Sequence, residues 1–216
     1  MRPSSHLADS LRRRRDDLLA VPRTAATARF WASVRSQHPR FAVAVVADAR
    51  VTALRRGERH EYRSGWDAAL QVLRLCLVTE SFLGQCCYRA KARCQALRIP
   101  LLPRLLHHMA VARGQINIGD PVVVEPGVHV PHGQVVADGM TRVASGVTLS
   151  PFVTLGLKAG DVVGPTVGHH AMIGTGAKVL GPVTVGAHAT VGANAVVTAD
   201  VPEGVTVVGI PARPAV

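Results

Sequence analysis

Residues 166–197 read TVGHHAMIGTGAKVLGPVTVGAHATVGANAVV, and this stretch repeats itself every six residues. The repeating positions are aliphatic: Val167, Ile173, Val179, Val185, Val191 and Val197. A period of six fits neither the helical period of about 3.6 residues nor the strand period of about two. It fits a coil with three short sides, in which each hexapeptide forms one side and its aliphatic residue points to the axis. The repeat therefore predicts a parallel β-helix rather than a sandwich of ordinary strands.

The same spacing begins before this stretch. Earlier aliphatic positions keep the interval, with one extra residue after the fourth: Ile118, Val124, Val130, Val136, Val143, Leu149 and Leu155. Residues 157–161 lack the pattern, and we expect a loop that leaves the coil there. Three hexapeptides make one turn, so the repeat predicts about five turns. The tail from Val207 to Arg213 is expected to fold back along the last turn.

The first half of the chain has a different pattern. Glycine is scarce in residues 1–113, and apolar residues recur there at helical spacing. Ser64 can cap a helix that begins near Gly65, and Pro100 ends it. The helices that we predict cover residues 7–20, 24–37, 41–56, 65–97 and 101–111. The expected fold class is α+β, with an all-helical domain at residues 1–113 and a β-helix domain with a C-terminal tail at residues 114–216.

Charge is divided unevenly between the two halves. Residues 1–113 carry 21 Lys and Arg against 8 Asp and Glu, whereas residues 114–216 carry 4 against 6. A basic half suits an anionic partner, such as a phosphorylated cofactor or an acidic carrier protein. Aromatic residues make up only 4% of the chain, and no recognition helix or zinc-finger pattern is present. We therefore do not expect nucleic-acid binding.

The sequence also argues against secretion and membrane insertion. The first 17 residues lack the apolar stretch of a signal peptide, and no uncharged apolar run is long enough to span a membrane. The four cysteines, at positions 76, 86, 87 and 94, form no Cys-x-x-Cys pair. Neither a zinc knuckle nor a disulfide framework is indicated, and a reduced cytoplasmic protein is the simplest interpretation.

Four segments carry a resemblance to a known family. They are Gly127–His132 (GVHVPH), Val153–Gly156 (VTLG), Met172–Gly181 (MIGTGAKVLG) and Val208–Arg213 (VGIPAR). With a helical half before the coil, the chain resembles the serine acetyltransferases, which are left-handed β-helix acyltransferases. The resemblance implies a left-handed coil, a homotrimer or a dimer of trimers, and an active site between neighbouring chains. It also implies acetyl-CoA, or another acyl-CoA, as co-substrate, and no metal.

The family's catalytic histidine matches His132. The resemblance assigns it as the general base that takes the proton of the acceptor hydroxyl while that hydroxyl attacks the thioester. Imidazole titrates near neutral pH, which suits this role. The family's aspartate that orients the base corresponds to Asn117. An amide oxygen can still accept the Nδ1 proton, but it cannot offset the charge of the imidazolium.

The resemblance extends to the donor and acceptor sites. The positions matched to donor binding are the small residues Gly156, Thr175 and Ala193 and the cations Lys178 and Arg213, which would meet the phosphates of CoA. The acceptor-side candidates are Glu58, His129 and His170.

Two departures from the family affect the acceptor. Pro131 stands where the family has an aspartate that helps to hold the serine ammonium. Val163, Gly164 and Pro165 stand where the family has an Arg-His-Pro that helps to bind serine. Specificity that depends on hydrogen bonds is lost when such groups are removed. The sequence therefore supports acyl transfer more strongly than it supports serine.

The function that we expect is acetyl transfer from acetyl-CoA to the hydroxyl of L-serine, a reaction of cysteine biosynthesis. One alternative is an acyltransferase of the same family that acts on another hydroxyl or amine of specialised metabolism, with a carrier protein as donor. A second is a catalytically silent homologue that assembles or regulates. A γ-type carbonic anhydrase would need a histidine five residues after His169, and Gly174 stands there.

Overall fold

The computed structural model describes residues 25–215. The chain divides into two compact units, Met1–Ser33 and Val34–Val216. Helix α2 (Ala25–Gln37) begins in the first unit and ends in the second. The helix predicted over residues 24–37 is thus confirmed, whereas the one predicted over residues 7–20 lies outside the described residues.

Four further helices follow in the second unit: α3 (Phe41–Arg55), α4 (Gly65–Val78), α5 (Phe82–Ala96) and α6 (Leu102–Gly114). Helix α3 ends before Gly57, whose φ of +70° is a conformation that glycine adopts without steric cost. Helix α4 begins at the predicted cap, because the Ser64 hydroxyl accepts a hydrogen bond from the Asp67 backbone N–H at 3.1 Å.

The prediction of one long helix over residues 65–97 was wrong, because the helix breaks at Thr79. Its backbone is extended, and its hydroxyl donates to the Leu75 carbonyl at 2.8 Å and accepts from the Phe82 N–H at 3.3 Å. The hydroxyl of Ser81 donates to the carbonyl oxygen of Val130 at 2.5 Å. Such side-chain bonds to the backbone compete with helical bonds. They turn the chain between α4 and α5.

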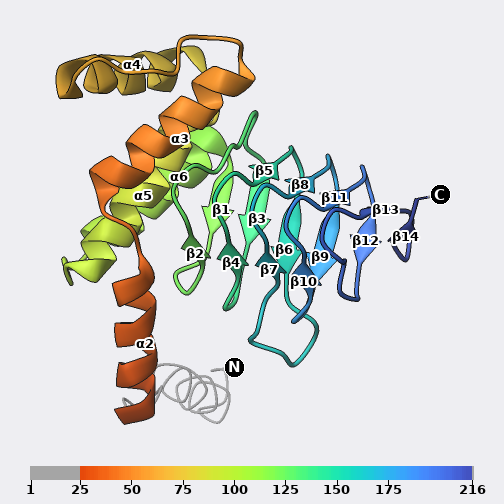
Figure 1. Cartoon of the computed structure of the whole chain (residues 1–216). Coiled ribbons are helices and arrows are strands. Elements are labelled where there is room, and N and C mark those ends of the chain that lie inside the picture. The colour runs from red at the N-terminus through yellow and green to blue at the C-terminus, as the bar shows by residue number, and fades with distance from the viewer. Residues whose placement is uncertain (1–24, 216) are drawn as a thin grey trace, which may run out of the picture. The chain divides into compact units, whose positions relative to one another are not determined.

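Residues from Ile116 onward wind into coils whose strands form three sheets. The first sheet contains β1 (Ile116–Ile118), β3 (Val135–Ala137), β6 (Thr154–Gly156), β9 (Lys178–Leu180) and β12 (Val196–Val197). The second contains β2 (Val123–Val124), β4 (Arg142–Val143), β7 (Thr166–Val167) and β10 (Thr184–Val185). The third contains β5 (Thr148–Leu149), β8 (Met172–Ile173), β11 (Thr190–Val191), β13 (Thr206–Val208) and β14 (Arg213–Pro214). Strands stack along the coil axis, as Figure 1 shows, and the five strands of the first sheet confirm the expected five turns.

The axis of the coil is filled by the repeating aliphatic residues. Val167, Ile173, Val179 and Val185 have no exposed surface, and neither does Val191. Burying such a side chain stabilises the fold by about 1.5–3 kcal/mol relative to leaving it exposed. The parallel β-helix predicted from the six-residue period is therefore confirmed.

The interruption and the tail also follow the predictions. Residues 157–165, between β6 and β7, contain no strand and project from the coil (Figure 1). Strand β14 pairs antiparallel with β13, so the tail folds back as expected. The secondary structure changes between Gly114 and Ile116, close to the predicted domain boundary. The helices from α3 onward share one compact unit with the coil, and that residues 1–113 and 114–216 form separate domains stays a prediction.

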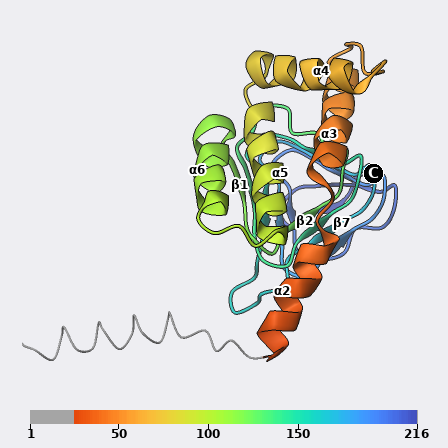
Figure 2. The ribbon, with the colours of Figure 1, turned by 90° about the vertical axis from the view of Figure 1, so that its left-hand side faces the viewer.

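Helices α3, α5 and α6 lie in front of the coils when the molecule is viewed along the coil axis (Figure 2). A buried ion pair links two of them to the first coil. Arg89 of α5 donates Nε and Nη2 to the carboxylate of Asp48 in α3 at 2.8 and 3.0 Å. Asp48 also accepts from the backbone N–H of Gly127 and Val128, and Arg89 donates to the carbonyl of Val124.

Close backbone contact between α5 and α6 depends on two glycines. A Cβ at Gly84 would lie 2.7 Å from the Cα of Gly114, and a Cβ at Gly114 would lie 2.8 Å from the Cα of Gly84. No side-chain carbon fits at these distances.

None of the helices in residues 25–215 combines the length and the apolar character needed to cross a membrane.

Replacing Gly84 with alanine is expected to lower the free energy of unfolding by about 1–3 kcal/mol, because the helices must move apart. Gly65→Ala is the matched control, since a Cβ there meets nothing within 4 Å. That control should be neutral or slightly stabilising. Urea denaturation followed by circular dichroism measures both, and equal stability of the two variants would contradict the packing described.

Candidate active site

His132 lies on the edge of the coil where the chain passes from the third sheet to the first. Its side chain is 65% exposed. Ring nitrogen Nδ1 lies 3.0 Å from Oε2 of Glu80 in the break between α4 and α5. Within residues 25–215, no hydrogen bond is formed to the other ring nitrogen, Nε2. An imidazole held at one nitrogen and open at the other can act as a base on an approaching ligand.

Buried contacts fix the backbone on both sides of this histidine. Before it, the carbonyl oxygens of Val130 and Pro131 accept bonds from the Ser81 hydroxyl at 2.5 and 3.2 Å. After it, Gly133 has a φ of +77°, and a Cβ there would lie 1.9 Å from the carbonyl oxygen of Gly114. The corner that carries His132 is therefore pressed against α5 and the end of α6.

The same edge of the coil carries two of the predicted donor-binding residues. Thr175 and Ala193 lie on later corners between the third and first sheets. The corners are stacked by backbone bonds, from Gly176 N–H to the Pro151 carbonyl at 2.9 Å and from Asn194 N–H to the Thr175 carbonyl at 2.8 Å. The structure thus places His132, Thr175 and Ala193 along one ridge.

The remaining donor-side residues lie on the sheets that meet at this ridge. Gly156 ends β6, and Lys178 begins the neighbouring β9 in the first sheet. The Lys178 ammonium donates to the Phe152 and Gly176 carbonyls at 2.8 and 2.9 Å. Arg213 is exposed in β14, at the edge of the third sheet.

Of the acceptor-side candidates, His129 is buried and Glu58 forms ion pairs with two arginines. His129 is only 7% exposed, and its Nδ1 has no hydrogen-bond partner among residues 25–215. Burial lowers its pKa to about 4, and the positive charges of Arg55 and Arg56 act in the same direction. His129 is therefore a neutral imidazole at neutral pH.

Glu58 is occupied by two arginines. Oε1 accepts from Arg56 at 2.9 Å, and Oε2 accepts from Arg74 at 2.8 Å. The bond from Arg74 is the main cause that holds the pKa of this carboxyl below its ordinary value. Glu58 thus connects the end of α3 to α4, and its predicted role in acceptor binding remains a prediction.

The last two candidates, His170 and Asn117, lie on other parts of the coil than the corner that carries His132. His170 lies on the edge between the second and third sheets, where its ring stacks on His188 with the centroids 5.1 Å apart. Asn117 lies on β1 and lines a hollow of about 320 Å³ together with Gln95 of α5, His107 of α6 and Asp120 of the first coil. No bond between Asn117 and His132 is among the hydrogen bonds of residues 25–215.

Glu80, whose carboxylate contacts His132, was not predicted from the sequence as a site residue. Glu80 and His132 are 52 residues apart, and no local pattern connects them. The signal that could have found it was the Thr79-Glu80-Ser81 sequence, because threonine and serine hydroxyls favour helix ends and breaks.

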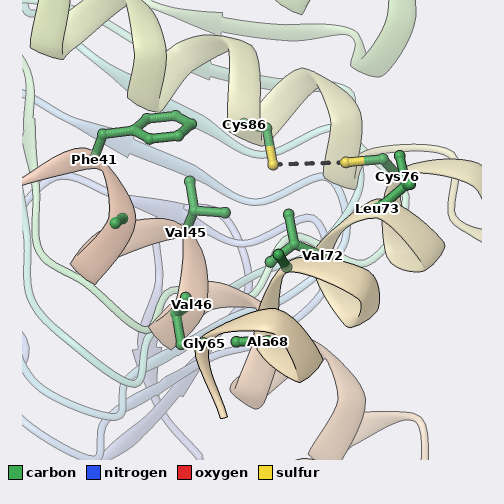
Figure 3. Close-up of a pocket in the computed structure, with 11 residues that line it drawn as sticks. Phe41, Val45, Val46, Gly65, Ala68, Val72, Leu73, Cys76 and Cys86 are labelled. Atoms are coloured by element: carbon green, nitrogen blue, oxygen red, sulfur yellow. Dashed lines mark hydrogen bonds between the residues drawn. The ribbon is translucent and has the colours of Figure 1, made fainter. Parts of the chain in front are cut away.

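A larger hollow of about 470 Å³ lies between α3, α4 and α5 (Figure 3). Its lining is apolar and includes Phe41, Val45 and Val72, together with the thiols of Cys76 and Cys86, whose sulfur atoms are 3.8 Å apart. It contains none of the predicted site residues and few polar groups that could orient a hydroxyl. It is therefore not the candidate site.

Metal-binding side chains do not gather in the described part of the chain. Among residues 25–215, no group of three or more His, Cys, Asp or Glu side chains is placed to hold a metal ion.

Comparison with known proteins gives two kinds of match. The family of bacterial transferase hexapeptides (six repeats) matches residues 164–199. The serine acetyltransferase of Synechococcus elongatus is 35% identical over 150 residues, which are 68% of this chain and 61% of that protein. The serine acetyltransferase of Helicobacter pylori strain J99 is 37% identical over 131 residues, which are 59% of this chain and 76% of that protein.

Solved structures agree with these relatives. The serine acetyltransferase of Neisseria gonorrhoeae in complex with serine superposes with a TM-score of 0.68 at 26% identity, over 81% of this chain and 68% of that one. A serine acetyltransferase in complex with CoA superposes with a TM-score of 0.63 at 27% identity, over 79% and 68%. This likeness confirms the expected left-handed β-helix after a helical half.

The match extends beyond the repeat but not over the whole of every relative. The chain spans 61% of the length of the Synechococcus protein and 76% of that of the Helicobacter protein. The identity over most of the Helicobacter protein and the shared fold identify the chain: it belongs to the serine acetyltransferase family.

Proposed function

We propose that this protein transfers the acetyl group of acetyl-CoA to the hydroxyl of L-serine, with His132 as the general base. The observation that carries the proposal is the position of this imidazole. It is exposed, is held at Nδ1 by a carboxylate, and lies on the same ridge as Thr175 and Ala193. The activity in the names of the relatives supports the same reaction.

The chemistry requires two proton transfers, one to the base and one from it. A serine hydroxyl is too weak an acid to be ionised near neutral pH, so it must lose its proton as the new bond forms. His132 Nε2 accepts that proton while the hydroxyl oxygen attacks the thioester carbonyl. The carbon–sulfur bond then breaks, and the departing CoA thiolate takes the proton back from the imidazolium. Such a base contributes a rate factor of about 100 to 10,000.

The donor would lie along the ridge. Small residues at Gly156, Thr175 and Ala193 let the amides of pantetheine approach the backbone, and Lys178 and Arg213 are cations for the phosphates of CoA. The related structure that contains CoA supports acetyl-CoA as co-substrate. Another acyl-CoA would fit the same contacts.

A second candidate acceptor is favoured by the loop and corner residues. Pro131, Val163 and Gly164 offer no polar side chain, and Val163 is 39% exposed. A site that lacks such groups discriminates weakly among hydroxyl compounds. A different hydroxyl or amine is therefore the alternative acceptor to L-serine. An acyl group delivered by an acidic carrier protein is the alternative donor to acetyl-CoA.

The proposal includes assembly in the cytoplasm as a homotrimer or a dimer of trimers, with the site completed by a neighbouring chain. Apolar side chains on the outer faces of two sheets support an interface, since Val136 and Met172 are 40% and 47% exposed. Light scattering of the full chain gives the number of subunits.

The test is an acceptor panel. The full-length protein is incubated with acetyl-CoA and a series of amino acids and amino alcohols, and free thiol is followed. Release with L-serine above the rate without acceptor is expected. Release only with another hydroxyl or amine would replace serine with that acceptor, and no release with any acceptor would overturn the proposal.

A further inference from the structure

We propose that Glu80 is the residue that positions the catalytic imidazole of His132. The inference rests on the proposed function for its kinetic consequence, but its structural content is independent of it. The carboxylate accepts the Nδ1–H of His132, which fixes the ring orientation and leaves Nε2 as the base.

The two side chains stand on backbone segments that are held together. Next to Glu80, the Ser81 hydroxyl is buried and donates to the carbonyl oxygens of Val130 and Pro131. Next to His132, Gly133 packs against the carbonyl of Gly114. The segments on which the two side chains stand are thereby held at a fixed separation even though both side chains are exposed.

The helix break provides the carboxylate. If residues 65–97 formed one helix, the Thr79–Ser81 segment would not turn toward the coil. The bonds of the Thr79 hydroxyl to Leu75 and Phe82 stabilise the break. The break is thus a structural device that brings an acidic side chain to the base from a distant part of the sequence.

The charge of Glu80 suits the reaction. His132 becomes a positively charged imidazolium in the transition state. The neutral His129 on the same coil cannot balance that charge. Glu80 offsets that charge, whereas Asn117 could supply an amide oxygen but no charge.

The expected effect is smaller than for a buried partner. Loss of a buried orienting aspartate lowers kcat by about 10,000-fold in serine proteases. Exposed ion pairs contribute much less. We therefore expect Glu80→Gln to lower kcat about tenfold, with the KM for acetyl-CoA unchanged. Glu61→Gln, at another exposed glutamate of the helical half, is the matched control and should leave kcat within about twofold of wild type.

A spectroscopic measurement separates the inference from the activity. The full chain is prepared with nitrogen-15 in histidine, and long-range nitrogen–proton correlation spectra assign the tautomer of His132, identified by its loss in His132→Asn. The ring should carry its proton on Nδ1 in wild type and on Nε2 in Glu80→Ala. A wild-type ring protonated on Nε2, or a tautomer unchanged by Glu80→Ala, would overturn the inference. Absence of turnover would overturn the proposed function only, because the spectra report the pairing without substrate.

Discussion

Replacing Asp48 with alanine is expected to lower the free energy of unfolding by about 3–5 kcal/mol, the larger of the stability effects predicted for this chain. Asp48 and Arg89 are 1% and 3% exposed. Without the carboxylate, the guanidinium of Arg89 keeps its carbonyl partners but stays buried with an uncompensated charge. The backbone N–H groups of Gly127 and Val128 also lose their acceptor. Helix α3 would then lose the bonds that Asp48 makes to α5 and to the first coil.

The control is an exposed ion pair on the same half of the chain. Arg59 and Asp67 are 2.6 Å apart, and the Arg59 side chain is 47% exposed. Arg59→Ala should therefore lower the free energy of unfolding much less than Asp48→Ala does. Urea denaturation measures both variants. A loss below about 1 kcal/mol for Asp48→Ala would show that the buried pair does not hold the helices to the coil.

Replacing His132 with asparagine is expected to lower kcat/KM by about 100- to 10,000-fold, the largest effect predicted on activity. Asparagine has no group that takes up a proton near neutral pH, so the acceptor hydroxyl keeps its proton as it attacks. Because the side chain of His132 is 65% exposed, the fold should be unaffected. Initial rates of thiol release give the comparison.

His188→Asn is the matched control for this substitution. His188 lies on another edge of the coil at a φ of +57°, a conformation that asparagine tolerates. Its rate should equal that of wild type. Activity of His132→Asn within about tenfold of wild type would exclude His132 as the base.

The coil was predictable because its signal is local and repeated. Each hexapeptide places one aliphatic residue at the axis, and Val167 and Val185 are fully buried as a result. The position predicted for the shift of phase was wrong, because Val136 is 40% exposed whereas Ala137 and Val143 are buried, which places the extra residue between Val130 and Ala137. A repeating pattern of this length constrains the backbone more strongly than any single residue does.

The site was only partly predictable. His132 could be proposed from a short matched segment, but its partner Glu80 could not, because the contact joins segments 52 residues apart. Thr79 is compatible with a helix interior when its surroundings are unknown. The Ser81 hydroxyl next to this helix end donates to the carbonyl of Val130, which belongs to the coil. The periodicity of a sequence contains no signal of tertiary contacts of this kind.

The product of the reaction tests the proposed chemistry most directly. Full-length protein is incubated with acetyl-CoA and L-serine, the mixture is quenched in acid so that the ester does not rearrange, and the acetylated serine is assigned by NMR. One O-acetyl-L-serine per CoA thiol released is the predicted result, abolished by His132→Asn. Formation of no acetylated serine, or of O-acetyl-L-serine at an unchanged rate in His132→Asn, would contradict acyl transfer to serine by this histidine.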